Sequence, residues 1–160
     1  MTLDAASVSV PEKASTSIRR MTPADVTAVC HIEQQIASSP WSPGNVLDSL
    51  TAGHLAWVMQ QGEEILAYAV ILQVLDEVEL LLIGVTAAHQ RRGHGHHLLT
   101  AILDSVRQAG GRTLFLEVRA SNESARMLYQ RLGLVVCGQR AGYYASPEGR
   151  EDALLMTKNL

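Results

Sequence analysis

The stretch Gln90-Arg91-Arg92-Gly93-His94-Gly95 decides how the rest of this sequence is interpreted. It follows an apolar run, Leu80 to Val85, that is typical of a buried strand, and it opens His96 to Gln108, which has the periodicity of an amphipathic helix. At such a junction the N–H groups of the first helical turn and the helix dipole favour an anion, and glycine lets it approach the backbone. The stretch therefore predicts a site for a phosphate-bearing ligand.

The composition is that of one ordinary domain. The chain has 160 residues, 47% of them hydrophobic, and a net charge of −3. It can bury a core without disulfides, and no global positive field favours nucleic acid. Because no apolar run approaches the roughly 18 residues of a membrane span, no membrane binding is expected. Residues 1–16 are interpreted as a flexible extension rather than a secretory signal, and residues 17–160 as the domain.

The cysteine usage indicates a reducing compartment. Cys30 and Cys137 lie far apart in the sequence, and each has apolar neighbours. We therefore expect two small core residues rather than a disulfide or a zinc site. This pattern, together with the absence of a signal sequence, favours the cytoplasm.

Periodicity and capping residues divide the domain into strands and helices. Strands are predicted over 17–20, 54–60, 64–75, 77–85, 112–118, 134–140 and 152–158, the last two as a hairpin across a loop from Ala141 to Glu151. Helices are predicted from Pro23 to about Ala37, from Pro43 after the cap Ser42 to near Gly53, over 96–108, and from the cap Asn122 to Leu132. This order predicts an α/β fold, a mixed sheet with helices on both faces.

Polar side chains follow the strand after the glycine-rich stretch and its helix. The strands on either side of that helix are expected to be parallel neighbours, and ligands in such sheets lie beyond the carboxyl ends of the strands. Glu117 stands at that end of the second strand. Asn122 and Tyr129 follow seven positions apart, so they share one side of the next helix.

Further motifs narrow the family. They are Leu116-Glu117-Val118-Arg119-Ala120-Ser121-Asn122, Leu128-Tyr129, Leu132-Gly133, Gly142-Tyr143-Tyr144, Gly149-Arg150-Glu151-Asp152-Ala153, His31-Ile32-Glu33-Gln34 and Pro40-Trp41-Ser42. With them, the chain from about Ser17 onward resembles the GNAT acetyltransferases, and among these the RimI-type ribosomal-protein alanine N-acetyltransferases. The glycine-rich stretch alone indicates only GNAT, whereas the later blocks are more specific.

The resemblance implies a single GNAT domain, with a mostly antiparallel sheet and a splayed parallel pair of central strands. It implies transfer of an acetyl group from acetyl-CoA, without a metal, to the N-terminal alanine of the eighteenth small-subunit ribosomal protein. For the cofactor it implies backbone contacts of the pantetheine arm and thioester with Ile83, Gly84 and Val85, a pyrophosphate cradle of Arg91, Arg92, Gly93, His94, Gly95 and His96, and a contact with Asn122.

The resemblance also implies the catalytic and acceptor residues. Glu117 is the general base, acting through water, and Tyr129 is the general acid at the departing thiolate. An α-amino group has a pKa of about 8 and a tyrosine hydroxyl one of about 10, so the two roles suit a carboxylate and a phenol. Glu33, Trp41, Tyr143 and Tyr144 are predicted to line the acceptor site.

The residues alone leave structural alternatives open. Glu117 also fits a solvated carboxylate at a strand edge, Tyr129 ordinary helix packing, and Glu33 a residue beside the apolar stripe of its helix. Trp41 and the two adjacent tyrosines fit either packing or the walls of the acceptor site. Other acceptors (different protein N-termini, lysines or small amines) and a non-catalytic acetyl-CoA sensor are alternative functions, with a monomer or weak dimer expected.

The histidines of the same region admit a metal site. His94 and His97 share a helical face beside His96, but no carboxylate or thiol lies near them in the sequence. Polar lining of the cofactor site, or simple exposure, is the favoured interpretation over zinc, and a pH-sensitive cofactor affinity is a further hypothesis.

Overall fold

A computed structural model describes residues 15–160. One sheet has the strand order β1-β2-β3-β4-β5-β7-β6. Its strands are β1 (Thr16–Arg20), β2 (Leu55–Gln61), β3 (Glu64–Val74), β4 (Glu77–Val85), β5 (Thr113–Arg119), β6 (Val135–Ser146) and β7 (Gly149–Asn159). All neighbours are antiparallel except β4 and β5, which are parallel. The predicted mixed, mostly antiparallel sheet is confirmed.

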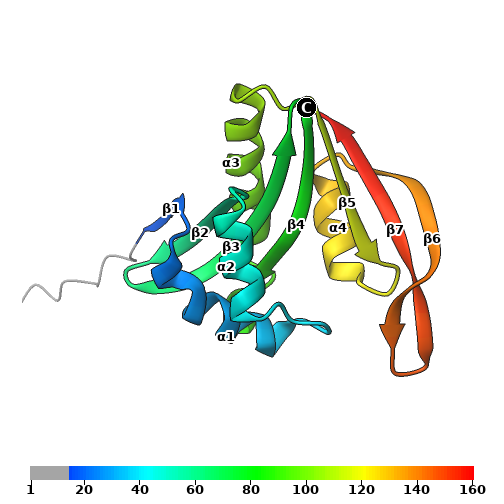
Figure 1. Cartoon of the computed structure of the whole chain (residues 1–160), viewed down its shortest axis with the longest axis horizontal. Helices are drawn as coiled ribbons and strands as arrows, with labels where there is room; N and C mark the ends of the chain where they lie inside the picture. Colours follow the sequence, from blue (N-terminus) through cyan, green and yellow to red (C-terminus); the bar gives the residue numbers. More distant parts are fainter. Residues whose placement is uncertain (1–14) are drawn as a thin grey trace, which may run out of the picture.

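Four α-helices cover the two faces of this sheet, as predicted (Figure 1). They are α1 (Val26–Ile36), which follows a 3-10 turn over Pro23–Asp25, α2 (Pro43–Thr51), α3 (His94–Gln108) and α4 (Glu123–Arg131). The predicted caps form at two of them: Ser42 Oγ accepts from the amide of Asn45 at 3.1 Å, and Asn122 Oδ1 accepts from the amide of Ala125 at 3.1 Å. Each cap satisfies a first-turn N–H group that would otherwise lack a partner.

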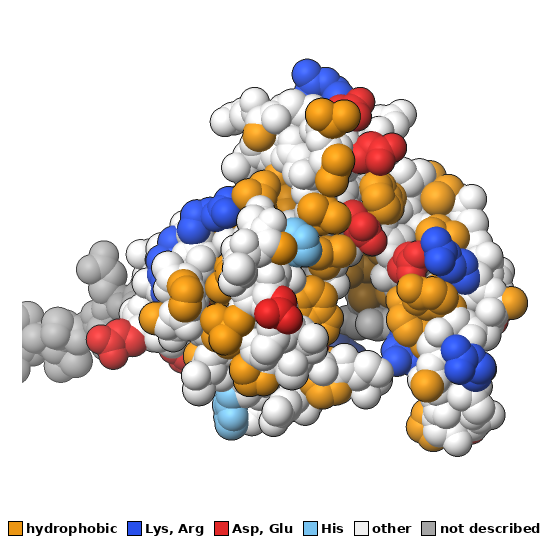
Figure 2. All heavy atoms as spheres, viewed as in Figure 1, with side chains coloured by type: hydrophobic (Ala, Val, Ile, Leu, Met, Phe, Trp, Pro, Cys, Tyr) orange, Lys and Arg blue, Asp and Glu red, His pale blue; other side chains and the backbone are white. Residues whose placement is uncertain are grey.

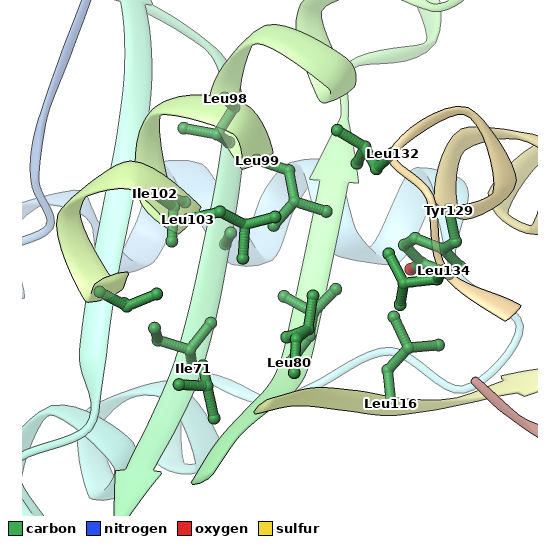
Figure 3. Close-up of a cluster of buried hydrophobic side chains, with 14 of the residues drawn as sticks. Ile71, Leu80, Leu98, Leu99, Ile102, Leu103, Leu116, Tyr129, Leu132 and Leu134 are labelled. Carbon is green, nitrogen blue, oxygen red and sulfur yellow. The ribbon is translucent and has the colours of Figure 1, made fainter. Parts of the chain in front are cut away.

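Helices α3 and α4 bury an apolar cluster against one face of the sheet (Figure 3). Leu98 and Leu99 of α3 are fully buried and point toward β3 and β4. Burying one leucine side chain stabilises a fold by about 2 kcal/mol. The predicted 3.6-residue stripe of α3 is therefore the main apolar contact on this face.

Helices α1 and α2 cover the other face with a second, smaller cluster. Val29 and Val46 are fully buried there against Val58, Tyr68 and Val70 of the sheet. The side chains that alternate along β2 and β3 thus separate into two cores, one on each face.

Strands β4 and β5 pair over a short distance and then separate. Their register covers only Glu77–Glu79 of β4 against Thr113–Phe115 of β5, and Figure 1 shows them side by side at one end and apart at the other. The register between β3 and β4 also shifts, since Val70 faces Leu82 whereas Ile71 faces Leu80. The extra residue, Leu81, forms a bulge, and a bulge bends its strand. The predicted splay of the parallel pair therefore has a local cause.

The loop predicted within the C-terminal hairpin is wrong. The predicted loop from Ala141 to Glu151 is mostly strand, because β6 continues to Ser146 and β7 begins at Gly149. A register shift between Arg140 and Tyr144, with Gly142 at φ 57°, takes up the irregular part while the strand continues. Glycine tolerates this left-handed backbone, and the tyrosines that follow favour an extended chain.

Cys137 is exposed, whereas Cys30 is buried as expected. Cys137 lies on β6, the last strand of the sheet, next to Val135 and Val136, which are 62% and 50% exposed. An apolar run indicates burial only if another element covers it, and no element among residues 15–160 covers this edge strand. Among residues 15–160, no helix is both long and apolar enough to cross a membrane.

Candidate active site

The glycine-rich stretch forms a tight connection between β4 and α3. Gly93 precedes the first residue of α3 in a left-handed conformation (φ 83°), and Arg91 is also left-handed (φ 60°). Gln90 Nε2 donates to the carbonyl of Val85 at 3.1 Å, which holds the connection against the end of β4. No side chain within the described residues caps α3. The arrangement suits an anion at this helix start, with Arg91 and Arg92 exposed beside it.

Gly95 allows three elements to meet at this point. A Cβ atom on Gly95 would lie 3.3 Å from Leu128 Cδ2 of α4 and 3.6 Å from Val85 Cγ2 of β4. A Cβ atom at Gly95 would need Leu128 to shift by a few tenths of an ångström, whereas its distance to Val85 is an ordinary van der Waals contact. The start of α3 is thus packed closely against the separating end of β4.

The last residues of β4 lie along the gap between the separated strands. Ile83, Gly84 and Val85 pair with β3 on one side, and their register with β5 has already ended. Figure 2 shows a hollow between the hairpin of β6 and β7, on the right of the view, and the rest of the molecule. Backbone groups of these residues can therefore bind an extended ligand that enters between the strands.

Glu117 of β5 has partners on β6, which lies beyond β7 in the sheet. Its Oε1 lies 3.2 Å from Arg140 Nη2, and its side chain is 20% exposed. Tyr143 donates a hydrogen bond to Glu117, and this bond is the main cause that raises the pKa of Tyr143. The carboxylate is therefore not a freely solvated edge residue, because a cation and a phenol already orient it.

Tyr129 of α4 lies on the other face of the sheet. It is 5% exposed, and Figure 3 shows its side chain beside Leu116 and Leu134. Because residues alternate between faces along β5, Glu117 points away from the face that Leu116 shares with Tyr129. Burial, and then the nearby Tyr144, raise the pKa of Tyr129, so the phenol keeps its proton at physiological pH.

Tyr144 connects these two environments. Its own pKa is raised by burial first and next by the charge of Glu117, and its hydroxyl is close enough to raise the pKa of Tyr129. Tyr143 stacks edge-on against it, with the ring centres 4.9 Å apart. The two tyrosines therefore lie with both predicted catalytic residues at the open end of the sheet.

Arg119 joins the β6–β7 hairpin to the connection between α1 and α2. It pairs with Glu151 Oε1 at 2.9 Å and donates to Ser39 Oγ at 3.0 Å, across 80 positions of sequence. Its guanidinium also lies 4.5 Å from the centre of the Tyr144 ring. One arginine thus fixes both segments that border the open end of β5.

Glu33 of α1 is buried rather than exposed at the flank of the helix's apolar stripe, with 3% of its surface exposed. Its Oε2 accepts a 2.5 Å hydrogen bond from the hydroxyl of Tyr68, and its Oε1 accepts a 3.4 Å bond from the amide of Trp41. The indole of Trp41 packs against the smaller core. The predicted acceptor residues Glu33 and Trp41 therefore belong to one cluster on the α1–α2 face, separate from Tyr143 and Tyr144.

Asn122 lies at the start of α4, and His94, His96 and His97 lie at the start of α3. The amide oxygen of Asn122 caps α4. His96 and His97 are exposed on the first turn of α3, and the ring of His94 lies 6.0 Å from that of His89. Among the described residues, no three or more His, Cys, Asp or Glu side chains gather as a metal would require.

Three contacts were not predicted from the sequence. Arg140 pairs with Glu117, Arg119 donates to Ser39, and Tyr68 donates to Glu33. One signal was available for Arg119, since it lies two positions after Glu117 and therefore on the same face of the strand. No local pattern marks the other two.

Comparison with known proteins agrees with this geometry. The model of the acetyltransferase (GNAT) family matches residues 26–134, and the chain belongs to that family. It is 39% identical over 132 residues to the [ribosomal protein bS18]-alanine N-acetyltransferase of Escherichia coli K12, covering 82% of this chain and 89% of that protein. The corresponding protein of Haemophilus ducreyi is 36% identical over 133 residues, with 82% and 92% coverage.

A solved structure is also closely similar. The crystal structure of the ribosomal-protein-S18-alanine N-acetyltransferase from Escherichia coli superposes with a TM-score of 0.86 at 36% sequence identity. The match covers 91% of this chain and 94% of that one. The predicted single GNAT fold and the RimI-type resemblance are both confirmed.

Proposed function

We propose that this enzyme transfers the acetyl group of acetyl-CoA to the N-terminal amine of ribosomal protein bS18, whose first residue is alanine. Relatives 36% and 39% identical over most of both chains carry that name. The observation that carries the proposal is the gap between β4 and β5, with Glu117 on one face of the sheet and Tyr129 on the other.

The residues around the gap fit acetyl-CoA. The amides from Arg91 to His96 bind the pyrophosphate at the start of α3, where the helix dipole favours negative charge. The backbone of Ile83, Gly84 and Val85 binds the pantetheine arm, and Asn122 contacts the cofactor from the start of α4. When bound, acetyl-CoA supplies the activated acetyl group.

Glu117 takes the proton from the acceptor ammonium in this proposal. An α-amino group is mostly protonated at neutral pH, so it needs a base before it can attack a thioester. The contacts with Arg140 and Tyr143 hold the carboxylate at the end of β5. A water between Glu117 and the amine completes the transfer.

Tyr129 donates a proton to the departing thiolate. Its raised pKa keeps the phenol protonated, which a donor requires. Tyr129 lies on the face that carries α3 and α4, and in this proposal the cofactor enters from that side. Base and acid then act from opposite faces of the sheet, the base at the attacking amine and the acid at the leaving thiolate.

The acceptor peptide lies between the α1–α2 connection and the β6–β7 hairpin. Trp41, Tyr143 and Tyr144 border it, and Glu33 supports the same region from beneath. Arg119 fixes the two borders to each other. The acceptor, a ribosomal protein N-terminus, and the reaction both fit a cytoplasmic enzyme.

The test is thiol release from acetyl-CoA with a short peptide that begins with alanine. Matched controls are the same peptide with a blocked N-terminus and a blocked peptide that carries a lysine. Turnover only with the free α-amine is expected. Turnover only with the lysine peptide would contradict the proposed acceptor, and cofactor binding without turnover on any amine would indicate a sensor domain.

A further inference from the structure

Each oxygen of the buried Glu33 carboxyl group accepts a hydrogen bond from within the chain. One oxygen accepts from the Tyr68 hydroxyl at 2.5 Å and the other from the Trp41 amide at 3.4 Å. These bonds join α1, the sheet and the connection between α1 and α2, residues 37–42. A buried polar group must be hydrogen bonded, and here every partner comes from a different element.

The phenol of Tyr68 occupies the space of a missing side chain on β4. Tyr68 faces Gly84 across the β3–β4 pair. A Cβ atom on Gly84 would lie 2.3 Å from the Tyr68 hydroxyl oxygen and 2.4 Å from Cζ, closer than atoms can approach. Gly84 is not among the glycines with positive φ, so space rather than backbone conformation requires glycine here.

This contact lies at the part of β4 that we propose binds the thioester. Gly84 belongs to the end of β4 that borders the gap, and Ile36 at the end of α1 also approaches its missing Cβ, at 2.9 Å. The hydroxyl of Tyr68 therefore lies between the strand proposed to bind the thioester and the helix whose end leads into residues 37–42. Tyr68 is fully buried, and burial with the Glu33 bond raises its pKa, so it remains the donor.

We propose that Tyr68 and Glu33 are positioning residues for the acceptor: seated on Gly84, they fix residues 37–42 at the border of the acceptor site. The inference rests on the proposed function and deepens it. We assign neither side chain a catalytic role, because Tyr68 donates to Glu33 and each oxygen of Glu33 accepts a hydrogen bond from the chain. Glu33 acts on the acceptor through the Trp41 backbone rather than through an ion pair with the amine.

The first variant is Tyr68→Phe, which keeps the ring and removes one hydroxyl. Because it leaves a buried acceptor without its donor, we expect the KM for the alanine peptide to rise about fivefold or more. The KM for acetyl-CoA and kcat are expected to stay within about twofold of the wild type. Hydrogen exchange of residues 37–42 is expected to become faster in the same protein.

Two Glu33 variants separate position from charge. Glu33→Ala removes both hydrogen bonds, and we expect a peptide KM at least as high as that of Tyr68→Phe. Glu33→Gln can accept from the Trp41 amide and donate to the Tyr68 oxygen, so it is expected to recover most of the loss seen in Glu33→Ala. An ion pair between Glu33 and the acceptor ammonium would instead leave the glutamine variant as impaired as the alanine variant.

Hydrogen exchange keeps this test separate from that of the proposed function. If wild-type enzyme does not acetylate alanine peptides, the proposed function fails, and exchange in Tyr68→Phe and Gly84→Ala still tests the pair. Faster exchange confined to residues 37–42 supports it. Unchanged exchange there, or a Tyr68→Phe effect on kcat and acetyl-CoA KM as large as on peptide KM, overturns the inference.

Discussion

The two faces of the sheet are held by different kinds of contact. On the face of α3 and α4, a large apolar cluster and one glycine-rich connection arrange the end of β4. On the face of α1 and α2, the core is smaller, and polar contacts such as Glu33 with Tyr68 and Arg119 with Ser39 join distant segments. The cofactor side thus follows from local sequence, whereas the acceptor side depends on long-range polar pairs.

The largest effect is expected at the residue that we propose to act on the acceptor. Glu117→Gln should lower kcat/KM for the alanine peptide about a thousandfold at pH 7, since a positioned base contributes up to about 10⁴-fold. The loss should shrink as the pH rises past about 8, because the free amine then needs no base. Glu148→Gln, in the hairpin turn, is the matched control. An unaltered pH–rate profile in Glu117→Gln would contradict the base role.

The next effect concerns stability and tests the apolar side. Leu99→Ala removes a fully buried side chain of α3 and should lower the free energy of unfolding by about 3 kcal/mol. Leu47→Ala, at a leucine of α2 that is 41% exposed, should change it by less than about 0.5 kcal/mol. Urea unfolding measures both, and equal effects would show that the large cluster is not the main core.

A somewhat smaller effect is expected at the acid on the cofactor face. Tyr129→Phe should lower kcat about a hundredfold and leave the unfolding transition near that of the wild type. Because the pKa of Tyr129 is raised above its usual value of about 10, the phenol stays protonated, and deprotonation of Tyr129 should cause no fall in wild-type rate below pH 10. Unchanged kcat in Tyr129→Phe would remove the residue from the mechanism.

The smallest effect concerns the polar anchor where β1 leads into α1. Asp25 binds both terminal nitrogens of Arg19 at 2.8 Å and the Thr22 amide at 2.8 Å. The hydrogen bond to Arg19 is the main cause that lowers the pKa of Asp25. A lowered folded-state pKa stabilises the fold above the unfolded value of about 3.9, and this contribution is lost as the pH falls through the folded value.

Asp25→Asn should therefore lower the free energy of unfolding by about 1–2 kcal/mol at pH 7. The difference from the wild type should shrink below about pH 4. Asp104→Asn, at an exposed pair with Arg107, should change the free energy by less than about 0.5 kcal/mol. A constant Asp25→Asn difference from pH 7 to pH 3 would show that ionisation of Asp25 contributes nothing.

What the sequence predicted follows the same division between the two faces. The glycine-rich connection, the caps at Ser42 and Asn122 and the apolar stripe of α3 are local patterns, and the structure confirms them. The sequence predicts too short a β6, because the irregular part of this strand around Gly142 has the sequence pattern of a loop. Its exposed Cys137 was also misplaced, since the sequence alone does not show which strand lies at the edge.

The candidate site was predictable only in part. Position and family resemblance predict Glu117 and Tyr129 as the catalytic residues. Their surroundings depend on residues far away in sequence: Ser39 lies 80 positions from Arg119, and Tyr68 lies 35 positions from Glu33. Such pairs form only after the chain has folded, so no local motif can indicate them.

The most direct test of the proposed reaction is the mass of the N-terminal fragment of intact bS18 after incubation with acetyl-CoA and enzyme. One added acetyl group on the terminal alanine is expected with wild-type enzyme. Almost none is expected at equal enzyme and time with Glu117→Gln, and the wild-type level is expected with Glu148→Gln. Acetyl groups on internal lysines alone, or equal N-terminal acetylation by Glu117→Gln and the wild type, would contradict it.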